Sequence, residues 1–151
     1  PKVATYDLKP EMSAGKVTEA LLNELDQTHY QLVVLNFANP DMVGHTGNLD
    51  AAILALETID ECLRKIIDWV ESNQAFAAVT ADHGNCEKMK DAEGNILTSH
   101  TTLPVPFIYI DPCHQSAKLA ATGKLADIAP TFLKVWNIAA PPEMSGQSLI
   151  L

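Results

Sequence analysis

Cysteine and long apolar runs are scarce in this sequence of 151 residues. Its three cysteines, Cys62, Cys86 and Cys113, are an odd number and none of them forms a C-x-x-C spacing. That pattern argues against a disulfide framework and favours a reducing compartment, so we expect a cytoplasmic protein. No apolar run approaches the roughly 20 residues that a membrane-spanning helix needs, so we expect no membrane partner.

Basic side chains are also few, because 19 Asp and Glu residues outnumber 10 Lys and Arg, for a formal net charge of −9. A chain this acidic repels phosphate backbones, so we expect no nucleic-acid partner. Arg64 is the sole arginine. Enzymes that hold a phosphorylated carboxylic acid use several Arg forks, so most of such a clamp would lie outside this chain. The chain begins with Pro1 instead of Met, so we expect a fragment or a trimmed product.

Apolar spacing predicts three helices, over 14–28, 48–72 and 125–137, with Ser13 placed to cap the first. Continuous apolar runs predict buried strands, and the other segments read as loops, a hairpin excursion and an edge strand in the tail. The predicted strands are 31–37, 76–80 and 105–110; the loops are 1–12 and 38–47; the excursion is 86–100; the tail is 141–149. This alternation indicates an α/β fold, a three-layer αβα sandwich around a mostly parallel sheet. No internal boundary is evident, so residues 1–151 are expected to belong to one domain.

Histidines and carboxylates gather at the expected strand boundaries, where ligands bind in open α/β sheets. Asp41 and His45 follow the first strand, Asp82 and His83 follow the second, and His100 precedes the third. Imidazole and carboxylate together form a nitrogen and oxygen ligand set that suits Mn, Zn, Fe or Co. Two ions about 3.5–4 Å apart can drive phosphoryl transfer, but five ligands are too few to saturate both. A further ligand would then come from outside this chain.

The same residues also suit ordinary structural roles. Asp41 could be a turn residue, His45 a helix cap, and Asp82 with His83 a corner after a strand. Each role is plausible for one residue alone, but all five residues at matching boundaries favour a metal site. The neighbours Ser99 and His100 could suggest a nucleophile with its base, yet adjacent residues in an extended segment point to opposite faces.

Several segments together resemble the C-terminal part of the cofactor-independent (2,3-bisphosphoglycerate-independent) phosphoglycerate mutases, which belong to the alkaline phosphatase superfamily. The most specific is the run Asn-Pro-Asp-Met-Val-Gly-His-Thr-Gly; the matching segments are 1–13, 39–47, 81–85, 99–101 and 146–149. The resemblance covers the whole chain. It implies a partial alkaline phosphatase-like fold and two divalent ions, with manganese favoured and Zn, Co, Mg or Fe as other choices.

Residue by residue, the resemblance implies that Asp41, His45 and His100 bind the first ion and that Asp82 and His83 bind the second. It implies an enzyme of glycolysis and gluconeogenesis that interconverts 2- and 3-phosphoglycerate through a phosphoserine. The nucleophilic serine, the N-terminal portion and the inserted substrate-binding domain are absent from this chain, so no catalytic nucleophile is expected here. We therefore expect a monomeric full-length mutase and an inactive fragment that could self-associate through exposed sheet surface.

Two alternatives stay open at this point. One is another phosphotransferase of the alkaline phosphatase superfamily, such as a phosphopentomutase or an archaeal-type mutase. The other is a domain that binds a metal or a partner protein without catalysis.

Overall fold

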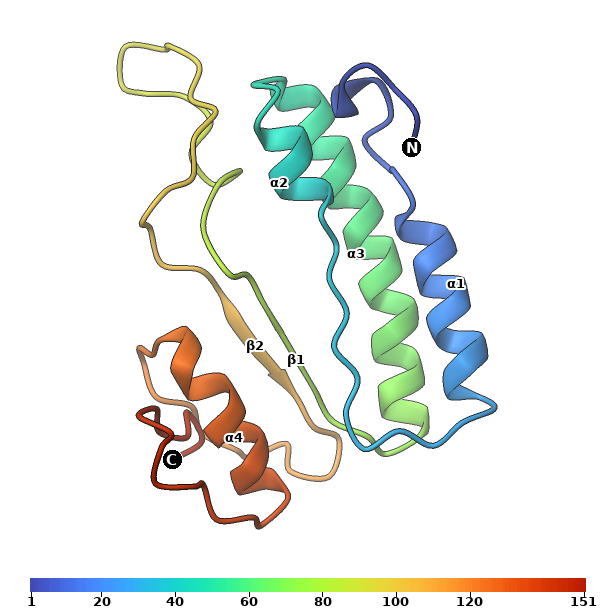
Figure 1. Ribbon diagram of the computed structural model, residues 1–151, viewed down its shortest axis with the longest axis vertical. Helices are drawn as coiled ribbons and strands as arrows, with labels where there is room; N and C mark the ends of the chain where they lie inside the picture. Colours follow the sequence, from blue (N-terminus) through green and yellow to red (C-terminus); the bar gives the residue numbers. More distant parts are fainter. The chain divides into compact units, whose positions relative to one another are not determined.

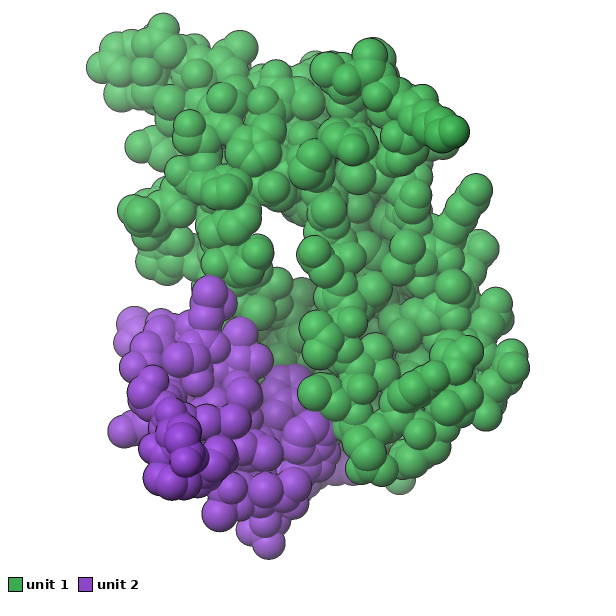
Figure 2. Space-filling view, in the orientation of Figure 1, with its two compact units in different colours: residues 1–110 green, residues 111–151 purple.

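The computed structural model describes all residues, 1–151, and they form two compact units, Pro1–Ile110 and Asp111–Leu151 (Figure 2). The sequence shows no boundary at this point, and the prediction that residues 1–151 belong to one domain stays a prediction. None of the helices has both the length and the apolar character of a membrane-spanning helix. Helices and strands are both present, as expected for the α/β class.

Two helices pack together in the first unit (Figure 1). Helix α1 spans Ala14–Leu25 and helix α3 spans Leu49–Ser72, which confirms both predictions, although α1 ends before the predicted residue 28. Ala14 of α1 and Ile59 of α3 belong to one buried apolar cluster, which positions the two helices against each other. The N-cap of α3 is Asn48, whose side chain accepts a hydrogen bond from the backbone of Ala51. Ser13 occupies the N-cap of α1 but makes no such bond.

A short helix, α2, occupies Asn39–Gly44, so the prediction of a loop over 38–47 is wrong there. Pro40 lies in its first turn, where the missing N–H costs nothing. The helix is fastened at its start, because Asn39 Nδ2 donates to the carbonyl oxygen of Pro10 at 2.8 Å. It is also fastened by Val43, which is fully buried against α3. Asp41 thus lies in the first turn of α2, and His45 directly follows the last residue of the helix.

The sheet within the chain is a two-stranded antiparallel ribbon. Strand β1, Ala77–Thr80, pairs with β2, Phe107–Ile110, so that Ala77 lies opposite Ile110. The predicted strands over 76–80 and 105–110 are confirmed, but the expected parallel pairing is not formed by these residues. No strand forms over 31–37, so this prediction is wrong: the segment makes no ladder. A strand requires a hydrogen-bonded neighbour, and this segment has none in the chain. Val34 in this segment is 86% exposed.

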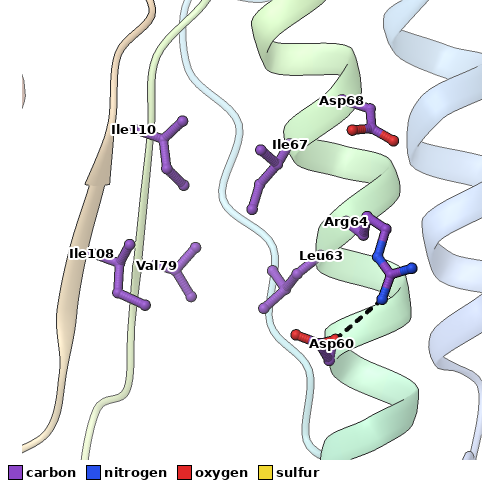
Figure 3. Close-up of a pocket in the computed structure, with 8 residues that line it drawn as sticks. All are labelled: Asp60, Leu63, Arg64, Ile67, Asp68, Val79, Ile108 and Ile110. Carbon is purple, nitrogen blue, oxygen red and sulfur yellow. Dashed lines mark hydrogen bonds and ion pairs between the residues drawn. The ribbon is translucent and has the colours of Figure 1, made fainter. Parts of the chain in front are cut away.

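An apolar cleft of about 310 Å³ separates α3 from the ribbon (Figure 3). Leu63 and Ile67 line it from α3, and Val79, Ile108 and Ile110 line it from the two strands. The ribbon therefore directs apolar side chains towards α3, as one face of a layered α/β fold does.

Residues between β1 and β2 form the excursion expected over 86–100. Two isolated antiparallel bridges close it, Gly84 with Thr101 and Lys90 with Ile96. Gly94 turns the chain at its tip with a φ of +87°, which glycine adopts without strain. His83 lies just before the first bridge and His100 just before its partner residue, so the bridge holds the two histidines near each other.

The second unit contains the last predicted helix, as a turn of 3-10 helix over Leu125–Asp127 followed by α4 over Ile128–Val135. Asp127 ties the tail of the chain to this helix. Its side chain accepts hydrogen bonds from the backbone N–H of Lys124 at 2.9 Å and of Gln147 at 2.8 Å. The edge strand predicted in the tail is wrong: residues 141–149 form no strand, and the residue after them, Ile150, makes an isolated bridge with Leu119.

Candidate metal centre

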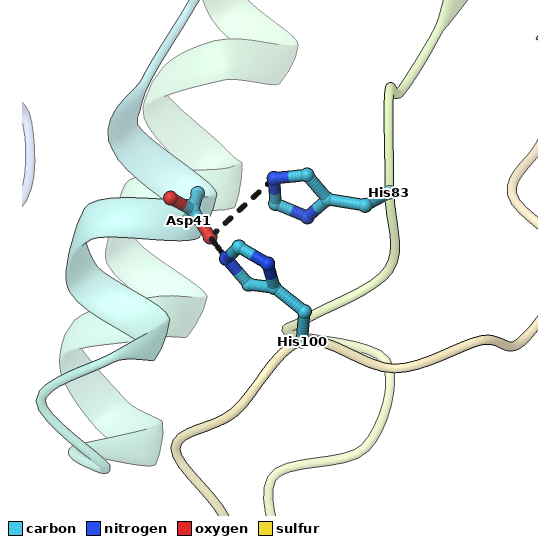
Figure 4. Close-up of side chains that lie close together, drawn as sticks. All are labelled: Asp41, His83 and His100. Atoms are coloured by element: carbon cyan, nitrogen blue, oxygen red, sulfur yellow. Dashed lines mark ion pairs between the residues drawn. The ribbon is translucent and has the colours of Figure 1, made fainter.

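Asp41 is the centre of a cluster of histidines in the first unit (Figure 4). Its Oδ1 atom lies 3.1 Å from Nε2 of His45 and 3.1 Å from Nε2 of His100. Nε2 of His83 lies 4.0 Å from the same oxygen. Asp41 and His45 are one helical turn apart, so the short helix α2 places both on one face. The segment between β1 and β2 supplies His83 and His100.

The histidine rings are in close contact. The rings of His83 and His100 stack with centroids 3.7 Å apart, and Nε2 of His45 lies 3.0 Å from Nε2 of His100. Nδ1 of His45 lies 2.5 Å from the carbonyl oxygen of Thr98, which can only accept, so Nδ1 carries the proton. In the neutral ring, Nε2 of His45 then presents its lone pair to the cluster. A metal ligand is oriented in this way when a backbone carbonyl holds its other ring nitrogen.

This donor set fits a divalent cation. The ligand atoms of Asp41, His83 and His100 all lie within 4.8 Å of one another. The Nε2 lone pair of His45 faces the carboxylate oxygen of Asp41 at 3.1 Å, and a cation between them removes the repulsion of lone pair and carboxylate. Nitrogen and oxygen donors suit Mn, Zn, Fe or Co.

The five predicted ligands differ in position. Asp41, His45, His83 and His100 come together in one cluster. Asp82 lies at its margin: its side chain is 86% exposed, and its Oδ1 lies 3.7 Å from Nε2 of His83. The assignment of Asp41, His45 and His100 to one ion, and of Asp82 and His83 to another, stays a prediction.

Three polar side chains that the ligand prediction did not include also contact the cluster or the backbone beside it. Asn85 is buried and its Nδ2 donates to Oδ1 of Asp41 at 2.7 Å. Glu87 accepts hydrogen bonds from the backbone N–H of Asn85 and from the hydroxyl of Thr101. The sequence signal for Asn85 was its place in the Asp-His-Gly-Asn segment; Glu87 and Thr101 carry no comparable signal.

Cys86 stands beside the cluster without joining it. Its Sγ lies 2.8 Å from the carbonyl oxygen of Pro40, to which the thiol donates. Burial, followed by the charges of Glu87 and Asp41, raises the pKa of the Cys86 thiol. The residue therefore remains a protonated thiol that fastens the start of α2, and it is a poor metal ligand in this state.

The chain is similar to metal-dependent enzymes. The pattern of the Metalloenzyme superfamily matches residues 1–140. The 2,3-bisphosphoglycerate-independent phosphoglycerate mutase of Clostridium botulinum (strain Langeland) is 55% identical over 151 residues, which are 99% of this chain and 29% of that protein. The protein of the same name from Clostridium acetobutylicum is 57% identical over 150 residues, again 99% of this chain and 29% of that protein.

A solved structure agrees. The crystal structure of Leishmania mexicana phosphoglycerate mutase at low cobalt concentration matches with a TM-score of 0.88 and 36% identity, over 100% of this chain and 30% of that one. The chain has the α/β fold of this alkaline phosphatase-like enzyme in part, and it spans about 30% of the length of the relatives. Since the superfamily pattern covers nearly the whole chain and an aspartate–histidine cluster lies within it, the chain belongs to the Metalloenzyme superfamily.

Proposed function

We propose that this chain is the C-terminal, metal-binding part of a cytoplasmic phosphoglycerate mutase that needs no bisphosphoglycerate cofactor. The convergence of three histidines on one carboxylate oxygen of Asp41 carries the proposal; they are His45, His83 and His100. Relatives that are 53–57% identical across the chain and bear this mutase name support it.

In this proposal Asp41, His45 and His100 hold one divalent ion, and Asp82 and His83 hold a second, with manganese as the favoured metal. When bound, such ions neutralise charge on a phosphoryl group and orient its oxygens. The work of this chain is to hold the ligands in place. The carbonyl of Thr98 fixes the ring of His45, and helix α2 fixes Asp41 one turn before it.

Other parts of the reaction fall to the remainder of the mutase. Arg64, the sole arginine of the chain, pairs with Asp60 on α3 and lines the apolar cleft, and it is not one of the residues that surround Asp41. The serine nucleophile and the substrate-binding arginines then belong to the part of the enzyme that this chain does not include. Phosphoglycerate is the substrate that we propose for the complete protein.

The first prediction concerns His45→Ala in the complete enzyme. Loss of Nε2 removes one ligand beside Asp41, and we expect kcat/KM for conversion of 3-phosphoglycerate to fall at least about 100-fold. Removing a residue that only supports a metal ligand typically costs about 10–100-fold, and loss of the ligand itself should cost at least as much. His29→Ala, which changes an exposed histidine, is the matched control and should leave turnover unchanged. Normal turnover in His45→Ala would end the assignment.

A further inference from the structure

Glu87 lies where the chain segments of the metal centre meet. One carboxylate oxygen, Oε2, accepts the backbone N–H of Asn85 at 2.6 Å. The other, Oε1, accepts the hydroxyl of Thr101, the residue directly after His100. A single side chain thereby joins the segment that follows His83 to the segment that carries His100.

The same contacts continue to the third segment through Asn85. The residue is only 6% exposed, and its Nδ2 donates to Oδ1 of Asp41 at 2.7 Å. The oxygen that accepts this bond is the one nearest to Nε2 of His45 and His100. Because Glu87 holds the backbone of Asn85, it also restrains the group that orients the Asp41 carboxylate.

Two glycines leave the space that these contacts occupy. A Cβ atom on Gly84 would collide with Oε1 of Glu87 and with Oγ1 of Thr101. A Cβ atom on Gly44 would collide with the side-chain amide of Asn85. Thr101 also donates its backbone N–H to the carbonyl of Gly84 at 2.9 Å. The backbone at both glycines is therefore shaped for the approach of Glu87 and Asn85.

The charge of Glu87 is consistent with two accepted hydrogen bonds. Burial acts to raise the pKa of its carboxyl group, but the bonds from Thr101 and from backbone N–H groups outweigh it, so the pKa is lowered. The ionised group offers two acceptor oxygens and no donor, which matches the two donors that face it.

We propose that Glu87 is a positioning residue for the metal centre, which sets the separation of His83, His100 and Asp41 through Thr101 and Asn85. The inference rests on the proposed function, because it concerns ligands of the same metal site. Glu87 itself is not expected to touch the metal or the substrate. Its effect should therefore be seen in metal affinity and in the geometry of the ligands.

The experiment titrates the complete, metal-free protein with Co²⁺ alone and records the affinity together with the visible absorption spectrum of the bound ion. Thr101→Val removes the hydroxyl and keeps the shape of the side chain, and we expect Co²⁺ to bind about 10–100-fold more weakly with an altered spectrum. Thr101→Ser retains the hydroxyl and should restore the affinity and the spectrum. Thr102→Val, at the exposed neighbouring position, should bind as the unmodified protein does.

A double-variant comparison tests whether Glu87 and Thr101 act as one device. Glu87→Ala and Thr101→Val should each weaken binding, and the double variant should bind no more weakly than the worse of the two. Fully additive losses, or unchanged affinity and spectrum in both single variants, would overturn the inference. If Glu87→Ala loses its circular-dichroism signal, Glu87→Gln takes its place. The amide of Gln can accept from only one of the two donors, so Co²⁺ should bind more weakly. Binding as tight as in the unmodified protein counts against the inference.

Failure of the proposed function has a different signature. If the unmodified protein takes up no Co²⁺ and His45→Ala remains active, the metal site itself is absent. If the unmodified protein binds Co²⁺ and the Thr101 and Glu87 variants bind it with the same affinity and the same spectrum, the metal site stands and the role of Glu87 is refuted.

Discussion

A single carboxylate oxygen of Asp41 has four close neighbours. His45, His83 and His100 approach it with ring nitrogens, and Asn85 donates to it from an amide. The amide of Asn85 holds this carboxylate in place beside the three rings.

The second prediction tests the close approach at Gly44, the last residue of α2. A Cβ atom at this position would meet the amide of Asn85 and Sγ of Cys86. We expect Gly44→Ala to lower the free energy of unfolding by about 1–3 kcal/mol, as overpacking does. Urea unfolding of the chain measures it.

Gly15→Ala is the control for that experiment. Gly15 lies in α1, and a Cβ atom there would meet nothing within 4 Å. Alanine favours a helix by roughly 0.5–1 kcal/mol over glycine, so this variant should be neutral or more stable. A Gly44→Ala variant as stable as Gly15→Ala would show that α2 can shift away from Asn85.

At the level of elements, the third prediction concerns the N-cap of α3. Asn48 accepts a hydrogen bond from the backbone of Ala51 at 3.2 Å. Asn48→Ala removes this bond, and we expect the free energy of unfolding to fall by about 1 kcal/mol. Ser13→Ala, at the N-cap of α1, should cost clearly less because the Ser13 side chain makes no capping bond. Equal losses in the two variants would contradict the capping role.

The fourth prediction concerns Asp127 and the pH dependence of stability. Backbone hydrogen bonds from Gln147 and Lys124 lower the pKa of this carboxyl group. A lowered pKa in the folded state stabilises the fold above the unfolded value, about 3.9, and that stabilisation is lost as pH falls through the folded value. Asp127→Asn should therefore be less stable than the unmodified chain at pH 7, with a difference that shrinks at acid pH.

Urea unfolding between pH 7 and pH 3 provides the measurement. Glu143→Gln, which neutralises an exposed carboxylate in the same unit, is the control and should show no such convergence. A stability difference for Asp127→Asn that stays constant over this range would contradict the role of the charged group.

Helix α3 could be predicted from the sequence because apolar spacing and the cap at Asn48 act locally. Helix α2 was missed because its six residues are too few to display a period. The segment 31–37 has the composition of a strand, but strand formation depends on a neighbour that composition does not report.

The grouping of the aspartate and the histidines was largely predictable, because it depends on residue type. Residue type limits which side chains can bind a metal, so Asp41, His45, His83 and His100 could be selected from few candidates. Asn85 acts through a contact formed only when α2 meets the excursion after β1, and hydrogen-bonding side chains are too common for such a contact to be predicted. The exposed position of Asp82 was likewise decided by tertiary structure.

For the whole molecule, the fifth prediction concerns removal of the metal. A ligand that binds only the folded state stabilises it by about 2.7 kcal/mol at a concentration 100-fold above its Kd. Added Mn²⁺ should therefore raise the thermal midpoint of the complete protein, and a chelator should lower it again. Differential scanning fluorimetry measures both. The His45→Ala variant should respond much less, and an equal response would place the stabilising ion elsewhere.

The clustered side chains come from α2, from the residue directly after it and from the segment between β1 and β2, at positions 41, 45, 83 and 100. No short stretch of the chain can assemble this site, so it exists only after these separate segments have met. Interactions absent from the folding transition state slow unfolding and leave the folding rate almost unchanged. Where the site assembles after that transition state, an ion held at Asp41 would lengthen the lifetime of the native state without hastening its formation.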